Sequence, residues 1–276
     1  MIYEFSVLIA TYYKDNSKCF ADAIKSVLNQ TYLPSEIVIV EDGPLTEALY
    51  ERINFYKISH AALFKIITLK ENLGLGNALD IGLKNCSNEL VARMDSDDIA
   101  VENRFEIQIN YFLKNPETAV LGGYMQEFSI VNNQKVFLQK KLAPLGTNYI
   151  KSYAQMRNPI NHPTVMFKKS IIEKVGSYKE ISLFEDYYLW LRLLKCGFEI
   201  NNVSDTLLFF RVGSSLVERR HGWQYLIKEF EFIILCYKEN LISFKALAVQ
   251  CITRLPLRVL PKSVLQVFYK TMLRKK

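Results

Sequence analysis

The chain has 276 residues, half of them hydrophobic, and a formal net charge of +7. This length and composition allow one large α/β domain, or a domain with an extension. No run approaches the roughly 20 apolar residues of a membrane-spanning helix, and the amino terminus lacks the basic-then-apolar plan of a signal peptide. The five cysteines are scattered without a Cys-x-x-Cys pair, which favours free thiols in a cytosolic protein over a disulfide or zinc framework.

The positive charge is concentrated at one end of the chain. Residues 240–276 hold eight of the 35 Lys and Arg residues and none of the 28 Asp and Glu residues. Such asymmetry predicts an anionic partner for the tail, either a membrane or a nucleic acid. The apolar residues of this segment fall near helical spacing, which fits a helix lying on a membrane surface. A helix packed on the preceding domain would show the same spacing.

The first 85 residues alternate between strand-like and helical patterns. The strand-like segments are continuous apolar runs, as expected of buried parallel strands. The predicted order is strand 5–10, helix 17–30, strand 36–40, helix 45–59, strand 65–69 and helix 74–85. This βαβ organisation predicts a parallel sheet with right-handed crossovers.

Three aspartates follow the fourth predicted strand. Residues 90–94 form a short buried strand that runs directly into Asp95, Asp97 and Asp98. Ligands of open α/β sheets bind beyond the carboxyl ends of the strands, and crowded acids repel one another unless a cation lies among them. Because Mg²⁺ typically bridges one or two carboxylates to substrate phosphates, we expect a metal–diphosphate site at Asp95 and Asp97. Period-two alternation would point Arg93 the same way.

The acidic stretch has two other interpretations. Asp98 could instead lie near the start of a helix at residues 101–113 and stabilise its N-terminus. A calcium-binding EF-hand loop is excluded, because Ile99 stands at its fifth position and Ala100 at the turn position that requires glycine.

The turn around Gly74 and Gly76 resembles half of a dinucleotide-binding motif. Leu79 replaces the third glycine, and the motif follows the third strand rather than the first, so NAD binding is not expected. A glycine turn at a helix start could still let backbone amides approach a phosphate or a base. A tight turn with positive φ is the alternative.

The second half of the chain is less regular. Residues 124–155 alternate weakly, as in a β-ribbon, and the last predicted elements are long helices. The predicted order is helix 101–113, strand 118–123, ribbon 124–155, strand 164–167, helix 170–175, helix 187–195 opened by Glu185 and Asp186, strand 203–211, and helices 219–238 and 242–252.

These segments together resemble the family 2 glycosyltransferases, inverting enzymes of the GT-A fold that build bacterial surface polysaccharides. The matching residues are 5–13, 23–31, 39–43, 71–83, 92–98 and the pair Glu185-Asp186. Residues 161–167 and 210–213, with the basic tail, are similar to O-antigen and exopolysaccharide transferases that act on lipid-linked acceptors. The resemblance implies an α/β GT-A domain over residues 1–215, with a nucleotide-sugar half at about 1–123 and an acceptor half at about 124–215. A helical basic extension, 216–276, follows it.

The resemblance also implies individual roles. Asp186 would be the catalytic base, and Asp97 with Asp95 would hold Mn²⁺ or Mg²⁺ on the donor diphosphate. The nucleotide-sugar would be bound by Thr11, Tyr13, Asp42, Asn72, Gly76, Asn77, Arg93 and Asp95. The acceptor side would include Glu185, His162, Trp190 and Arg211.

One position departs from the family pattern. Many relatives carry a metal-binding histidine two residues after the arginine that matches Arg211, and here Gly213 stands at that place. His162 and His221 are other candidates for the third ligand, although each is expected to be a structural or surface residue.

The resemblance implies transfer of a hexose, from UDP-galactose or UDP-glucose, to a sugar on a polyprenyl pyrophosphate with formation of a β bond. Residues 240–276 would hold the enzyme on the anionic inner face of the cytoplasmic membrane, with no nucleic acid as partner. Two alternative functions make different demands on the sequence. A nucleotidyltransferase should show an early glycine-rich basic loop, which residues 11–15 are not, and a nucleic-acid binding protein should show a recognition motif in the tail or a basic core.

Overall fold

The computed structural model describes residues 3–132, 134–212 and 222–259, with side chains described as far as Arg254. The chain divides into two compact units, of which the first comprises Met1–Val212 and the second Gly213–Lys276.

The first part of unit one alternates strands and helices, as the sequence predicts. Its elements are β1 (Phe5–Thr11), α1 (Ser17–Leu28), β2 (Glu36–Glu41), α2 (Glu47–Ser59), β3 (Phe64–Thr68), α3 (Leu75–Asn85), β4 (Leu90–Arg93), β5 (Ile99–Ala100) and α4 (Arg104–Lys114). The rest of the unit contains β6 (Thr118–Val131), β7 (Gln134–Lys141), α5 (Thr147–Ala154), the 3₁₀ helix η1 (His162–Thr164), β8 (Met166–Lys168), α6 (Lys169–Lys174), α7 (Glu185–Lys195) and β9 (Glu199–Arg211).

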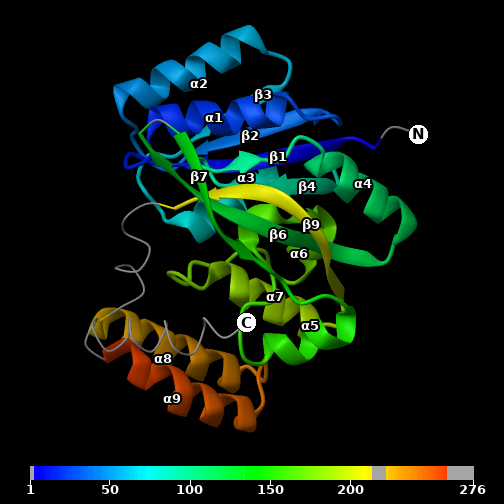
Figure 1. Ribbon diagram of the computed structural model, residues 1–276, viewed down its shortest axis with the longest axis vertical. Coiled ribbons are helices and arrows are strands. Elements are labelled where there is room, and N and C mark those ends of the chain that lie inside the picture. The colour runs from blue at the N-terminus through cyan, green and yellow to red at the C-terminus, as the bar shows by residue number, and fades with distance from the viewer. Residues whose placement is uncertain (1–2, 133, 213–221, 260–276) are drawn as a thin grey trace. The chain divides into compact units, whose positions relative to one another are not determined.

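In the described part of the chain the strands form one nine-stranded sheet, in the order β3-β2-β1-β4-β8-β6-β9-β5, with β7 paired to β6 (Figure 1). Strands β3, β2, β1 and β4 are parallel. Strand β8 is antiparallel to both β4 and β6, and β9 is parallel to β6. The carboxyl ends of β1, β2, β4, β6 and β9 therefore point the same way, which places the loops that follow them at one edge.

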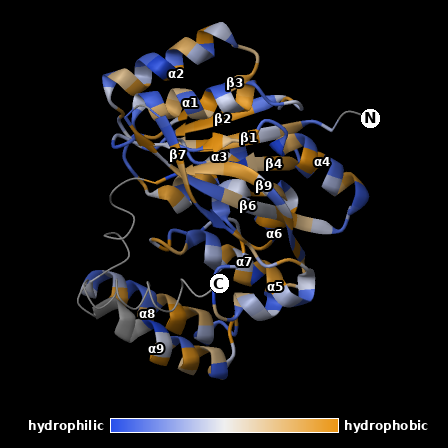
Figure 2. Cartoon of the chain, in the orientation of Figure 1, coloured by the Kyte–Doolittle hydropathy of each residue, from blue (hydrophilic) through white to orange (hydrophobic). Residues whose placement is uncertain are grey.

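Alternate residues of the central strands face two separate cores. Val7 and Ile9 of β1 pack among residues of α1, α2 and α4, whereas Leu8 packs among residues of α3 and α7. The strands are buried on both faces, which explains their continuous apolar sequence. Figure 2 shows this hydrophobic centre, with hydrophilic residues on the outer faces of the helices.

Several predicted boundaries are wrong for local reasons. Helix α1 ends at Leu28 rather than at residue 30, and Asn16 caps its start, because the Asn16 side chain accepts hydrogen bonds from two backbone amides of the first turn. Only part of the expected ribbon at 124–155 is a β-hairpin, since a helix, α5, begins after Gly146, whose φ is +84°. Asp98 caps no helix: α4 begins with Asn103 at its N-cap, and Asp98 is fully buried.

The described part of unit two is a pair of helices, α8 (Trp223–Lys238) and α9 (Phe244–Val259), that pack against each other. Arg254 of α9 lies 3.6 Å from the buried carboxylate of Glu229 on α8. Among the described residues, no helix is both long enough and apolar enough to cross a membrane.

Helix α3 packs closely on the sheet at Gly82. A Cβ atom at this position would lie 2.4 Å from a methyl of Leu8 and 2.6 Å from a methyl of Val40. We expect Gly82→Ala to destabilise the protein by about 1–3 kcal/mol, the usual cost of overpacking, as measured by urea unfolding. Lys84→Ala, on the exposed side of the same helix, is the control and should cost no more than about 0.5 kcal/mol. A stabilised Gly82→Ala variant would show that α3 packs loosely.

Candidate active site

The predicted acidic stretch lies at the carboxyl edge of the sheet, directly after β4. The side chain of Arg93 is buried beneath it and forms an ion pair with Asp95. Burial, together with the charges of Asp95 and Asp15, raises the pKa of Asp97 to about 6. The pKa of Asp98 is raised well above its usual range, mainly by burial and then by Asp95 and Asp97. Burial and the repulsion between neighbouring carboxylates therefore both disfavour the ionised form of these groups.

A divalent cation shared with a phosphorylated ligand would stabilise the ionised form of these carboxylates. In the part of the chain that the structure describes, no three or more His, Cys, Asp or Glu side chains are grouped to hold a metal ion by themselves. Hard cations such as Mg²⁺ are commonly held by one or two carboxylates and completed by substrate phosphates and water. Asp95 and Asp97 fit that smaller donor set. Of the candidates for a third ligand, His221 lies outside the described residues.

Asp15 is a member of this edge that the sequence analysis missed. Its Oδ2 atom accepts hydrogen bonds from Thr11 Oγ1 (2.9 Å), Tyr12 N (3.2 Å) and Ser96 Oγ (2.6 Å). Burial raises the pKa of the Asp15 carboxyl, against the hydrogen bonds from Ser96 and Thr11. Asp15 thus ties the loop after β1 to the acidic stretch. An acid four residues after Thr11, close to a strand end, was the signal available in the sequence.

Asp42 and Asn72 come together as predicted, at the ends of β2 and β3. Asn72 Nδ2 donates to the backbone oxygen of Asp42 (3.2 Å), and Oδ1 of Asp42 accepts from Leu73 N (2.7 Å). Gly43, with φ +83°, permits this contact, because a Cβ there would lie 2.6 Å from Asn72 N. Tyr13, on the neighbouring β1 loop, is half exposed.

The glycine turn before α3 does not present its first amides to open space. The backbone N–H of Gly76 donates to Oε2 of Glu180 (3.0 Å), and that of Asn77 lies 3.4 Å from the same atom. The Asn77 side chain donates to Leu73 O (2.9 Å). A carboxylate of the same chain thus lies beside the Gly76 amide in this structure, and the role of Gly76 and Asn77 in binding the nucleotide-sugar stays a prediction.

Asp186 lies in the first turn of α7, where an acid is favoured by the helix dipole. Its Oδ2 accepts from Asn158 Nδ2 (2.6 Å) and its Oδ1 from Tyr187 N (2.7 Å). Asn158 is a second residue that sequence reasoning missed. Burial, and then the charge of Asp186, raises the pKa of Glu185 to about 7.

Three residues expected on the acceptor side have other neighbours. Trp190 is fully buried, and the buried His162 packs edge-on against it and hydrogen-bonds to the Tyr178 hydroxyl at 3.0 Å. Burial holds the pKa of His162 well below its usual range. Both rings are buried in this structure, and their place on the acceptor side stays a prediction. Arg211 instead braces the acidic stretch, donating from its backbone to Asp98 Oδ1 (2.9 Å) and from Nε to the Asp97 carbonyl (2.9 Å).

Comparison with known proteins agrees with this arrangement. The model of glycosyl transferase family 2 matches residues 6–176. The chain is 36% identical over 272 residues to the UDP-Gal:alpha-D-GlcNAc-diphosphoundecaprenol beta-1,3-galactosyltransferase of Escherichia coli, covering 99% of this chain and 97% of that one. It is also 36% identical to the amylovoran biosynthesis glycosyltransferase AmsE of Erwinia amylovora, over 96% of this chain and 98% of the relative.

Solved structures share the fold at lower identity. A mannosyltransferase from Pyrobaculum calidifontis, in complex with GDP-Man and Mn²⁺, superposes with a TM-score of 0.66 at 14% identity, over 98% of this chain and 75% of the other. TarS of S. aureus (residues 1–349), in complex with UDP-GlcNAc, gives 0.62 at 18% identity, over 99% and 76%. The expected GT-A fold is confirmed, and the chain belongs to glycosyl transferase family 2.

Proposed function

We propose that this glycosyltransferase moves galactose from UDP-galactose to an N-acetylhexosamine on a polyprenyl pyrophosphate, with metal dependence, inversion and a β bond as product. The observation that carries the proposal is the similarity to the Escherichia coli galactosyltransferase, which extends over 99% of the chain. Both units of the chain therefore match an enzyme that is named for a lipid-linked acceptor.

The donor would lie at the carboxyl edge of the sheet. Thr11, Tyr13, Asp42 and Asn72 flank one side of that edge, and Arg93 with Asp95 the other. Asp97 and Asp95 would hold Mn²⁺ or Mg²⁺, which when bound neutralises negative charge on the departing diphosphate. The crowding of buried carboxylates at this edge supports the assignment of a metal to Asp95 and Asp97.

Asp186 would act as general base on the acceptor. The acceptor hydroxyl oxygen attacks the anomeric carbon, the bond from that carbon to the diphosphate oxygen breaks, and the hydroxyl proton passes to the Asp186 carboxylate. A single displacement of this kind inverts the configuration. The hydrogen bonds from Asn158 and Tyr187 N fix the direction of the carboxylate. Glu185, beside it, would contact the acceptor or orient its neighbour.

The metal assignment is tested with Asp97→Ala. UDP release from UDP-galactose, with an N-acetylglucosamine-diphospholipid acceptor and Mn²⁺, should fall by about a hundredfold or more, because several kcal/mol of charge stabilisation are lost. UDP affinity in Mn²⁺ should fall as well, with an unchanged circular dichroism spectrum. Asp205→Ala, at an exposed position of β9, is the control. Full wild-type activity in EDTA would contradict the assignment, and a parallel assay with UDP-glucose checks the donor.

The base is tested with Asp186→Asn, which keeps the size of the side chain and removes its basicity. Turnover should fall by about 10² or more, whereas the affinity for UDP should change little. A decrease of only a few-fold would mean that Asp186 merely caps α7 and that the proton goes elsewhere.

The second unit has features of a membrane-surface domain. Trp223, Ile227 and Phe230 follow one another at helical spacing on α8, and Trp223 is 70% exposed. Phe244 and Ile252 of α9 are also exposed. Interfacial helices combine such apolar residues with basic ones, and each Lys or Arg near an anionic surface adds about 1 kcal/mol. The basic residues beyond residue 259 lie outside the described structure. A lipid-linked acceptor would place the enzyme at the inner face of the cytoplasmic membrane.

Sedimentation with phosphatidylglycerol vesicles tests this surface. The wild-type protein should bind at low salt and dissociate as salt is raised, because screening weakens the electrostatic part. The double substitution Trp223→Ser and Ile227→Ser should weaken binding about tenfold or more. Phe55→Ser with Ile58→Ser removes an equally exposed apolar pair from α2 and should leave binding unchanged. Absence of binding by the wild type at low salt would refute the membrane role, and retention on heparin would favour nucleic acid.

A further inference from the structure

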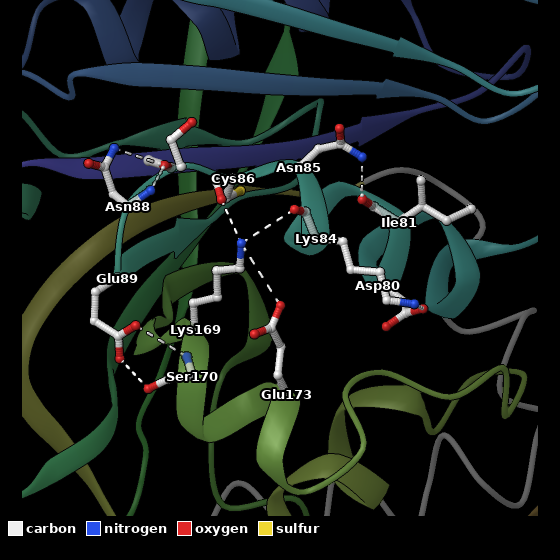
Figure 3. Close-up of polar contacts among 12 residues, drawn as sticks. Asp80, Ile81, Lys84, Asn85, Cys86, Asn88, Glu89, Lys169, Ser170 and Glu173 are labelled. Carbon is white, nitrogen blue, oxygen red and sulfur yellow. Dashed lines mark hydrogen bonds and ion pairs between the residues drawn. The ribbon is translucent and has the colours of Figure 1, made fainter.

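One segment of the acceptor half holds both ends of α3. At the N-terminus of the helix, Oε2 of Glu180 accepts from the backbone N–H of Gly76 (3.0 Å) and lies 3.4 Å from that of Asn77. At the C-terminus, Nζ of Lys169 donates to the carbonyl oxygens of Cys86 (2.7 Å) and Lys84 (3.3 Å) (Figure 3). An anion at the first turn and a cation at the last both complement the helix dipole.

The glycines of the turn allow the contact with Glu180. A Cβ atom at Gly74 would lie 2.7 Å from the Glu180 carboxyl group, and one at Gly76 would lie 2.6 Å from the carbonyl oxygen of Lys179. Gly74 also has a φ of +87°. The glycine-rich sequence is thus explained by the close approach of residues 179–180, which are more than 100 positions away in the chain.

The contact made by Glu180 lies close to site residues, whereas the contact made by Lys169 does not. Glu180 is six residues before Asp186, and the connection is tight: Ile181 N donates to Lys179 O (2.9 Å) and Phe184 N to Ile181 O (2.8 Å). The turn that it holds follows Asn72 and Leu73, which contact Asp42. Lys169 binds the opposite end of α3, one helix length away, where Figure 3 shows Glu89, Ser170 and Glu173 around it.

We propose that Glu180 is a positioning residue that fixes the base, Asp186, relative to Asn72 and the turn at residues 73–77 that follows it. The proposal rests on the function given above. Loss of the carboxylate frees the segment before α7 from α3, so the carboxylate of Asp186 no longer keeps its place opposite the donor. A displacement of about 1 Å in a reacting group can cost about a hundredfold in rate.

Lys169 provides the matched control, because Lys169→Gln removes a charged contact at the opposite end of the same helix. We expect Glu180→Ala to lower kcat about tenfold or more and to raise the acceptor KM, with UDP affinity within about threefold of wild type. Glu180→Gln keeps a carbonyl acceptor for the two amides and should recover most of the loss. Lys169→Gln should lower the melting temperature by a similar amount while kcat stays within about twofold.

Equal losses of kcat in Glu180→Ala and Lys169→Gln would overturn the proposal and make Glu180 a stabilising cap only. A loss of UDP affinity in proportion to kcat would overturn it as well. Hydrogen exchange gives a readout that needs no activity: peptides covering residues 181–190 should exchange faster in Glu180→Ala and not in Lys169→Gln, and unchanged exchange refutes the role. If the wild-type protein transfers no galactose, the proposed function fails, and the exchange comparison still decides whether Glu180 fixes the segment before α7.

Discussion

The crowding of carboxylates after β4 is the constraint on which the rest of the site depends. Asp95, Asp97 and Asp98 repel one another, and burial of Asp97 and Asp98 adds to the cost of their ionisation. A buried charge without a partner costs several kcal/mol. The fold therefore brings two guanidinium groups to this edge, Arg93 from beneath and Arg211 from the end of β9. What charge remains is suited to a cation bound with a diphosphate.

Two polar side chains of α4 hydrogen-bond to the backbone near these charges. Arg104 donates to the carbonyl oxygen of Arg93 (2.8 Å), and Gln108 donates to that of Thr164 (2.9 Å). Burial, together with Arg93, lowers the pKa of Arg104 to about 9. These bonds satisfy backbone groups at the junction where antiparallel β8 is inserted between β4 and β6, and an unsatisfied buried carbonyl there would cost about 1–3 kcal/mol. The junction is also where the donor half meets the acceptor half.

Some neighbours could not be read from the sequence. The resemblance placed His162 and Trp190 on the acceptor side, and in the structure both rings are buried against each other. The sequence left open whether the turn at Gly74 and Gly76 receives a ligand or is a tight turn with positive φ, and the structure places Glu180 beside it. The residue type at a position limits which contacts its side chain can make, but the contact that it does make depends on which residues the folded chain packs against it.

The sequence by itself determined the helices and strands of the first half, because their signals are local. A strand buried on both faces of a parallel sheet needs a continuous apolar run, and a helix that covers the sheet needs apolar residues at helical spacing. It also determined the acidic stretch after β4 and the acid pair that opens α7. Only the tertiary structure decided the partners: Asp15 beside Ser96, Asn158 beside Asp186, and Glu180 on α3. Each of these contacts joins residues that are 28 to 104 positions apart, so its existence depends on how strands and helices pack, which no local pattern encodes.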